Sequence, residues 1–323
     1  MRQIGLVRNG NDIEPITRDA SNYLSVSLSA DGRTLATVQR RTYATISVLT
    51  KAGREFGAPR PILSESNVEI WWSRLSWSAD GNLFFNKFSR LFKLGVDGKS
   101  QTQLLADPNT LVYFPSSCGT NYIVMTLLPS GTRSYSIWRT SADGSSPLKL
   151  TDGKLDFLPV CSPDQKWVYY SDWRKQISRV PLDGSGKTEV LFTVREGYGD
   201  FFGVSISPDG KTLAVAVRKG QEVGAKVALF DLGSPKPPRT LDTTHYSGGP
   251  EFTPDGKSVA YVGRENGVDN VWVQPLDGSA GHPITDFKSE QIWSFSLSPD
   301  GKSLAVLRGH WDSDVVLLQD TKP

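Results

Sequence analysis

The chain has 323 residues, and its 36 Lys and Arg against 34 Asp and Glu leave a formal net charge of +2. This near balance, with no basic run, argues against nucleic-acid binding. No stretch of about 18 apolar residues occurs, and the first 11 residues lack the apolar segment of a signal peptide. We therefore expect no membrane span and a cytoplasmic protein, or a periplasmic one if the sequence was cut from a longer exported or membrane-anchored parent.

The first predicted elements are two short strands near the N-terminus. Residues 3–7 have the composition of a strand that is third in its sheet, and residues 12–17, which contain Pro15, that of a short outer strand. They precede every copy of the repeat described next. Their place in the fold therefore depends on how the repeats are arranged.

A short polar turn between two apolar segments recurs seven times along the chain. The copies lie at residues 29–33, 78–82, 116–119, 162–166, 207–211, 253–257 and 298–302. The clearest two read Ser-Pro-Asp-Gly-Lys, and the copy at residues 116–119 is eroded. Measured from the glycine position of each turn, the copies are 49, 38, 46, 45, 46 and 45 residues apart. A period in the forties is typical of propeller blades, each of which is a four-stranded unit.

Each turn is predicted to join two strands of one hairpin. Proline presets a turn φ, aspartate can accept a hydrogen bond from the backbone just ahead of it, and glycine takes a positive φ without steric cost. The flanks alternate in polarity as half-buried strands do, for example at residues 204–207 and 212–217. The turn and its flanks therefore predict the two inner strands of each blade.

Two further strands are predicted in each period, and no segment predicts an amphipathic helix. The third strand, such as residues 270–273, ends in most copies at an Asp-Gly turn, and the fourth is short, such as residues 282–285. We therefore expect one all-β domain over residues 1–323, a seven-bladed β-propeller of four-stranded antiparallel blades. The predicted blades start near residues 23, 71, 111, 157, 201, 247 and 292.

The last blade lacks a fourth strand within its own repeat. Its first three strands are predicted at about residues 292–298, 303–308 and 313–319, after which the chain stops. We expect residues 12–17 to complete this blade, so that residues 1–17 close the ring. Residues 3–7 then have no vacant position, which suggests that the chain was cut from a longer array of repeats.

Aromatic and basic residues cluster in the loops predicted at one face of the ring. These loops lead into the first strand of each blade or join its second and third strands, and such residues are typical of recognition surfaces. We predict a binding face around the channel mouth. The alternative is that the aromatic rings pack between blades and the basic side chains are merely solvated. The predicted face consists of Trp71, Trp72, Tyr113, Phe157, Trp173, Arg174, Tyr198, Phe201, Arg218, His245, Tyr246, Arg264, Trp293, Arg308 and His310.

Catalytic or metal-binding groups are scarce. Of the three histidines, His245 and His310 could share the face with a carboxylate and hold a metal ion, but their spacing matches no compact motif. No serine-hydrolase elbow, Walker loop or kinase signature is present. We expect no catalytic residues, no metal and no cofactor. Cys118 and Cys161 lie in neighbouring repeats at non-equivalent positions, so we expect two free thiols, with a disulfide as the alternative.

The repeated turns, together with Asp277-Gly278, Pro283-Ile284-Thr285 and the stretch Gln291–Lys302, resemble TolB-like propeller repeats over nearly the whole chain. The segment from Arg308 to Leu317 resembles the C-terminal propeller of bacterial serine/threonine kinases and winged-helix regulators. The resemblance implies a bacterial sensor or interaction module that binds a protein, peptide or small ligand at the channel mouth. The alternative is a carbohydrate-active lyase or hydrolase that uses His245 or His310, because similar blades also occur in enzymes.

Overall fold

The computed structural model describes residues 2–8, 12–19, 21–67, 73–105, 107–172, 176–193, 198–219, 225–234, 236–243 and 246–319. The side chains of residues 198–202, 218, 219, 225 and 247 lie outside this description. All regular structure in the described part is β-strand, as predicted. It contains no helix that could cross a membrane.

Five antiparallel sheets contain four strands each, in chain order. The first two sheets consist of β7 (Ser76–Trp77), β8 (Leu83–Lys87), β9 (Arg90–Leu94) and β10 (Gln101–Gln103), and of β11 (Thr110–Cys118), β12 (Tyr122–Pro129), β13 (Ser136–Ser141) and β14 (Leu148–Lys149). The third consists of β15 (Asp156–Cys161), β16 (Trp167–Asp172), β17 (Gln176–Pro181) and β18 (Glu189–Thr193). The fourth and fifth consist of β19 (Tyr198–Ile206), β20 (Thr212–Lys219), β21 (Ala225–Asp231) and β22 (Arg239–Leu241), and of β23 (Tyr246–Phe252), β24 (Ser258–Glu265), β25 (Val268–Pro275) and β26 (His282–Pro283).

The sixth large sheet joins the two ends of the chain. It contains β27 (Gln291–Leu297), β28 (Ser303–Gln319), β4 (Thr34–Ala52), β3 (Asn22–Leu28) and β6 (Arg60–Ser66), and the short β5 (Glu55–Phe56) also pairs with β4. A separate two-stranded sheet consists of β1 (Gly5–Arg8) and β2 (Asp12–Pro15).

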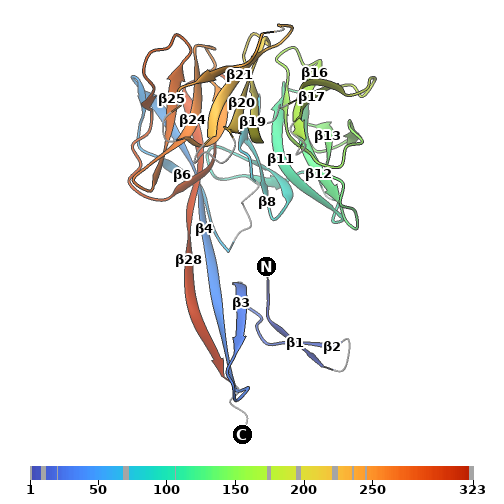
Figure 1. The fold of residues 1–323 in the computed structure, drawn as a ribbon, viewed down its shortest axis with the longest axis vertical. Helices are drawn as coiled ribbons and strands as arrows, with labels where there is room; N and C mark the ends of the chain where they lie inside the picture. Colours follow the sequence, from blue (N-terminus) through green and yellow to red (C-terminus); the bar gives the residue numbers. More distant parts are fainter. Residues whose placement is uncertain are drawn as a thin grey trace.

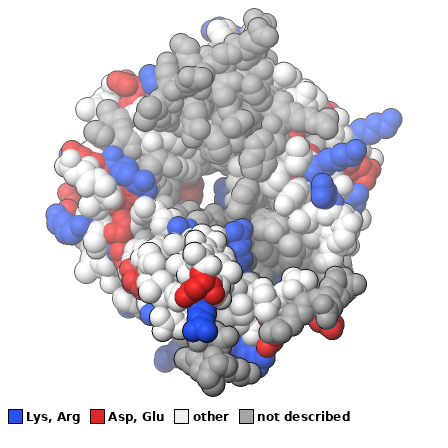
Figure 2. Space-filling view, turned by 60° about the horizontal axis from the view of Figure 1, so that its bottom comes forward, with Lys and Arg blue, Asp and Glu red and all other residues white. Residues whose placement is uncertain are grey.

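The six large sheets are arranged as blades around a central opening. Their innermost strands contact one another in the order β7, β11, β15, β19, β23, β27 and back to β7. A space-filling view shows the opening near the centre of a rounded body, with basic and acidic side chains interspersed around it (Figure 2). The prediction of seven blades is not met in the described residues, which form six sheets of four or more strands.

The difference arises in the first and last repeats, because β4 and β28 do not turn back where the other repeats do. Residues 44–50 of β4 pair with residues 303–309 of β28 inside the ring, and residues 34–40 pair with residues 313–319 outside it. Strands β3, β4 and β28 therefore leave the ring as a ribbon (Figure 1). The expected closure by residues 12–17 is also corrected, because β2 pairs with β1 and the outer strand of the last blade is β6.

The repeated turns have the geometry that their sequence predicts. In the copy at residues 207–211, Ser207 Oγ donates to Asp209 Oδ1 at 2.6 Å, and the Thr212 amide donates to Ser207 Oγ at 2.9 Å. The Lys211 amide donates to Asp209 Oδ1 at 3.1 Å, and Gly210 has a φ of 71°. The turn thus satisfies its own polar groups, which explains why it recurs at solvent-exposed ends of the blades.

The core is divided among the interfaces between neighbouring blades. One cluster joins Val160 and Tyr169 from the third four-stranded sheet to Leu213 and Val215 from the fourth. Because both faces of β20 are covered, Leu213, Ala214 and Val215 are fully buried. Burial of this apolar surface is the main favourable contribution to the ring.

The two cysteines form a disulfide, which corrects the expectation of free thiols. Cys118 and Cys161 end the innermost strands β11 and β15, and their Cα atoms are 5.3 Å apart. Their positions looked non-equivalent because the turn after Cys118 is eroded, which shifts the numbering of that repeat. At the ends of neighbouring inner strands, the two side chains are within bonding reach.

Candidate functional site

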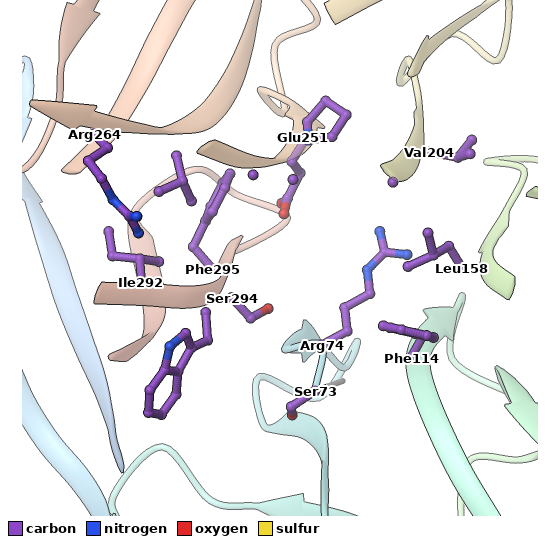
Figure 3. Close-up of a pocket in the computed structure, with 16 residues that line it drawn as sticks. Ser73, Arg74, Phe114, Leu158, Val204, Glu251, Arg264, Ile292, Ser294 and Phe295 are labelled. Carbon is purple, nitrogen blue, oxygen red and sulfur yellow. The ribbon is translucent and has the colours of Figure 1, made fainter. Parts of the chain in front are cut away.

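A pocket of about 490 Å³ opens into the channel at the middle of the ring (Figure 3). It receives residues from all six blades. The lining residues are Ser73, Arg74, Phe114, Leu158, Gly203, Val204, Gly248, Gly249, Pro250, Glu251, Val262, Arg264, Ile292, Trp293, Ser294 and Phe295.

One equivalent position in each blade forms the pocket wall. It lies seven residues before the turn glycine, or before Gln165 in the fourth repeat, and falls in a bulge of β15, β19 and β23. In β27 the bulge is one residue earlier, at Trp293. In the eroded repeat the matching bulge is at Phe114. A bulge re-aims one side chain out of the regular alternation, here toward the channel. The six residues at this position are Arg74, Phe114, Leu158, Gly203, Gly249 and Ser294.

The pocket exists because these six positions differ in size. Three successive blades contribute the small residues Gly203, Gly249 and Ser294, whereas the other three contribute Arg74, Phe114 and Leu158. The backbone at Phe114 and Leu158 is left-handed, with φ of 51° and 58°, and so is that of the two glycines. Four of the six positions therefore share a left-handed backbone, and the difference in side-chain size hollows out one side of the channel.

Glu251 supplies the carboxylate of the pocket. The same position holds Ser76, Ser205 and Ser296 in other blades, and Ser205 Oγ there accepts a hydrogen bond from the Phe252 amide at 3.0 Å. Glu251 Oε1 makes the equivalent contact, accepting from the Leu297 amide at 2.8 Å. Burial raises the pKa of Glu251 to about 7, although the Leu297 hydrogen bond and the charge of Arg74 oppose the shift.

Arg74 supplies a positive charge that forms no ion pair with a described residue. Its guanidinium points into the pocket in Figure 3, and its Nη1 donates to the Pro159 carbonyl at 3.2 Å. Burial lowers the pKa of Arg74, and the charge of Glu251 opposes this effect. An arginine nevertheless keeps its proton at any physiological pH. Arg74 forms no ion pair with any residue that the structure describes.

Arg264 lies on the pocket wall with its charge already compensated. Its Nε and Nη2 donate to the two carboxylate oxygens of Asp269 at 2.6 and 3.0 Å. The Asp269 carboxylate is fully buried and also accepts from the Ile292 amide at 2.9 Å. This pairing raises the pKa of Arg264. Arg264 therefore fixes the loop between β24 and β25, whereas Arg74 remains available to a ligand.

The structure brings two members of the predicted face, Arg264 and Trp293, into this pocket. Trp293 packs against Trp311 with ring centroids 5.2 Å apart, and its buried Nε1 has no hydrogen-bond partner among the described residues. Both residues came from the predicted loops. They line the pocket from the blades of β23 and β27.

Three other predicted aromatic residues pack against neighbouring rings. Tyr113 and Phe157 each contact Tyr135, with centroids 5.9 and 4.6 Å apart, beside the pocket residue Phe114. Tyr246 stacks on Tyr261 at 5.7 Å. None of the three is among the residues that line the pocket. Their contacts agree with the packing alternative considered for the aromatic residues.

Arg308 and His310 are also placed away from the pocket. Arg308 stacks on the Phe287 ring at 3.8 Å and donates to the Ser289 carbonyl at 2.7 Å. His310 stacks on Tyr43 at 5.0 Å, and its Nδ1 lies 3.2 Å from Glu290 Oε1. Both residues belong to β28 near the base of the ribbon, and neither is among the residues that line the pocket.

The remaining members of the face are not described. Trp71, Trp72, Trp173, Arg174 and His245 lie outside the described residues, as do the side chains of Tyr198, Phe201 and Arg218. Among described residues, no group of three or more His, Cys, Asp and Glu is arranged to hold a metal ion. The alternative metal site needed His245, so it involves a position that the structure does not describe.

Sequence reasoning missed two of the three charged residues that line the pocket, Arg74 and Glu251. It considered loops, whereas both residues belong to the segments that form the innermost strands. A signal was present for Glu251, because aligned copies of the repeat carry serine at this position in three other blades. An ionisable residue replacing a small one next to the channel is a candidate functional group.

A family model described as the TolB beta propeller domain matches residues 118–322. The chain belongs to this family. A TolB-like propeller is consistent with the all-β structure and with the sheets of four antiparallel strands. The described residues confirm the predicted all-β class, and the family match confirms the TolB-like resemblance. Nothing in either supports the likeness to kinase or winged-helix proteins.

Relatives of this TolB-like propeller include uncharacterised and enzymatic proteins. An uncharacterised protein of Agrobacterium fabrum is 26% identical over 186 residues, which span 49% of this chain and 57% of that protein. The solved structure of a putative TolB from Agrobacterium tumefaciens has 19% identity and a TM-score of 0.69, covering 83% of this chain and 99% of that one. A gluconolactonase from Xanthomonas campestris has 16% identity and a TM-score of 0.55, covering 82% and 95%. These structures show that the fold is shared.

Proposed function

We propose that this TolB-like propeller is a noncatalytic binding module that takes the carboxylate end of a peptide or small ligand into the pocket. The observation that carries the proposal is the Arg74 guanidinium, which points into the pocket without an ion pair to any described residue. A planar guanidinium matches a carboxylate with two parallel hydrogen bonds. Such a module would act as a sensor or an interaction domain.

The walls and size of the pocket fit this ligand class. A volume of about 490 Å³ is within the range of ligand sites and suits one or two peptide residues. Leu158, Val204 and Phe295 offer apolar contact for the body of the ligand. Glu251, with a pKa of about 7, is largely protonated in weak acid and can then donate a hydrogen bond to an anion.

The described residues that line the pocket do not include the groups that the enzymatic alternative needs, and His245 lies outside the described part. Glu251 is the only carboxylate among the described lining residues, and these include no histidine, cysteine or lysine. A lyase or hydrolase generally needs a second acid, a base or a metal ion. His310, which we considered for that role, is engaged with Tyr43 and Glu290 outside the pocket.

The test is a titration with short peptides of identical sequence, ending in either a free carboxylate or an amide. We expect the free-acid forms to bind, and Arg74→Gln to weaken them by about tenfold or more, because a charged hydrogen-bonded pair is lost. Arg54→Gln, at an exposed turn outside the pocket, is the matched control and should bind normally. Equal affinity for the free-acid and amide forms, or for the wild type and Arg74→Gln, would reject the proposal.

A further inference from the structure

Three strands outside the ring form a sheet with the design of a blade. We define the extension as β1, β2, β3, residues 34–40 of β4 and residues 313–319 of β28 (Figure 1). Within it, residues 34–40 pair with β3 on one side and with β28 on the other. This order matches the first, second and third strands of a blade.

The sequence of this sheet confirms the likeness. Thr34-Leu35-Ala36 repeats Thr212-Leu213-Ala214 of β20, and the turn before it has the blade geometry. The Thr34 amide donates to Ser29 Oγ at 2.9 Å, and Gly32 has a φ of 72°. In the ring Leu213 and Ala214 are fully buried, whereas Leu35 and Ala36 are partly exposed. The same sequence is therefore covered in one place and uncovered in the other.

Strands β1 and β2 carry the signature of the two outer strands of a blade. The Ile4 amide donates to Thr17 Oγ1 at 2.9 Å, and the Ile16 amide donates to the Ile4 carbonyl at 2.8 Å. The blade of β25 and β26 has the same pair of bonds, because the Val271 amide donates to Thr285 Oγ1 at 2.9 Å and the Ile284 amide donates to the Val271 carbonyl at 2.8 Å. The hairpin thus has the geometry of third and fourth strands, yet no described strand pairs with it as a second strand.

Both faces of the extension sheet are apolar and exposed. Val26 and Val316 flank Thr37 on one face, and Leu317 lies next to Ala36 on the other. Val26, Val315 and Leu317 are 57%, 74% and 62% exposed. Of the exposed large hydrophobic residues in the described part, all except Ile16, Phe88 and Val190 belong to the extension, and Ile16 directly follows β2. A sheet with one solvated face needs only one apolar face, whereas a blade needs two.

We propose that the extension belongs to a second propeller ring made of further repeats of this same kind. The three-stranded sheet would be the first three strands of one blade, and β1 and β2 the last two strands of the blade before it. Neighbouring blades would cover its two apolar faces as they cover β20. The established blade interface continues into the extension, because β4 and β28 run unbroken from one to the other.

Other partners that could cover the apolar faces of the extension account for fewer of these observations. The ring itself has no free position, because β27 already contacts β7. A second copy of the chain would bring the same incomplete pieces, leaving β28 without a fourth strand and β1 without a second. Further repeats provide both strands. They also explain why β1 and β2 keep outer-strand geometry without inner strands.

A tandem chain tests the proposal directly. Residues 101–310 are placed ahead of the intact chain and joined to it by an Asn-Gly turn, as at residues 266–267 between β24 and β25. The added segment begins with a copy of β10, which provides a fourth strand for β28, and continues with copies of four complete blades. It ends with copies of β27 and the first part of β28, which provide the two inner strands for β1 and β2. Together with the extension, these strands make six blades. We expect amide hydrogen exchange in residues 24–28 and 313–319 to slow by at least about tenfold relative to the single chain. A tandem chain with protected ring strands but unchanged exchange in these residues would overturn the proposal.

A second measurement decides the matter should the tandem chain not fold. The single chain and its Val315→Lys, Leu317→Lys double variant are compared by light scattering and by binding of an apolar dye, with Val190→Lys as the control on the ring. We expect a monomer whose dye binding falls in the double variant but not in the control. A stable dimer that the double variant dissociates would assign the face to a second copy and overturn the proposal.

Discussion

Glu251 and Arg74 face one pocket from the two blades that flank the last one, and each lowers the electrostatic cost of burying the other. Their blades are joined through β27, because the Leu297 amide donates to Glu251 and the Trp77 indole donates to the Ser296 carbonyl at 2.9 Å. The charges of the pocket are therefore held by the same contacts that bring the ring together. Their protonation should affect both stability and binding.

The first prediction concerns the pH dependence of stability. Burial raises the pKa of Glu251 from 4.5 to about 7, so between these values the native state holds a proton that the unfolded state releases. The free energy of unfolding should then fall as pH rises through this window, by about 2–3 kcal/mol in total from this group. Glu251→Gln keeps an acceptor for the Leu297 amide but does not titrate, so its stability should depend less on pH.

The measurement is urea unfolding of the wild type and Glu251→Gln at several values between pH 5 and 8.5. Asp156, whose pKa burial raises to about 6, contributes to both proteins and cancels in the difference. We expect the free energy of unfolding of Glu251→Gln to rise relative to that of the wild type as pH rises. Parallel profiles would show that Glu251 is ionised throughout.

The second prediction compares the two halves of the Arg264–Asp269 pair. Arg264→Met leaves the fully buried carboxylate of Asp269 without its charged partner. Asp269→Asn leaves the Arg264 guanidinium without its partner, but that side chain is 43% exposed and can reach water. We expect Arg264→Met to cost about 3 kcal/mol and Asp269→Asn about 1 kcal/mol, because desolvation penalises only the buried partner strongly. The midpoints of denaturant unfolding of both variants show which of them loses more stability. A larger loss for Asp269→Asn would contradict this account.

The third prediction concerns the disulfide. Cys118 and Cys161 join neighbouring blades across 43 residues of sequence, so opening the bond should destabilise the ring by about 2–4 kcal/mol. The Cys118→Ser, Cys161→Ser double variant should unfold at lower urea than the oxidised wild type and be indifferent to reductant. Alkylation under denaturing conditions without reductant should label no thiol in the wild type. Full labelling would support the free thiols that the sequence favoured.

How much of this fold was readable from the sequence depended on how local each feature is. The hairpin turns were predictable because Ser207, Asp209 and Gly210 close the turn among themselves. The number of blades was not, because it depends on whether the chain reverses between second and third strands. The described reversals in other repeats use left-handed residues, such as Asn266 and Gly267, and the corresponding segments of β4 and β28 have none.

The pocket was less predictable than the fold for a similar reason. The residues that line it are aimed by bulges, and even Phe114 and Leu158 adopt a left-handed backbone there. Residue type alone does not indicate such a conformation. The loop pattern singled out Arg264 and Trp293, which line the pocket, but gave no weight to Arg74 and Glu251.

The fourth prediction fills the pocket without disturbing the ring. A Cβ at Gly249 meets only the Phe295 ring at 3.9 Å, and Leu158 already adopts the equivalent left-handed backbone in another blade. Gly249→Leu should therefore cost only about 1–2 kcal/mol of stability, from the left-handed φ of 42°. Its side chain would occupy the pocket, so the free-acid peptides that bind the wild type should lose affinity by about tenfold or more. Gly233→Leu, at a turn with a φ of 79° and open space around it, is the matched control and should bind like the wild type at a similar stability cost. Retained binding in Gly249→Leu would place the ligand elsewhere on the ring.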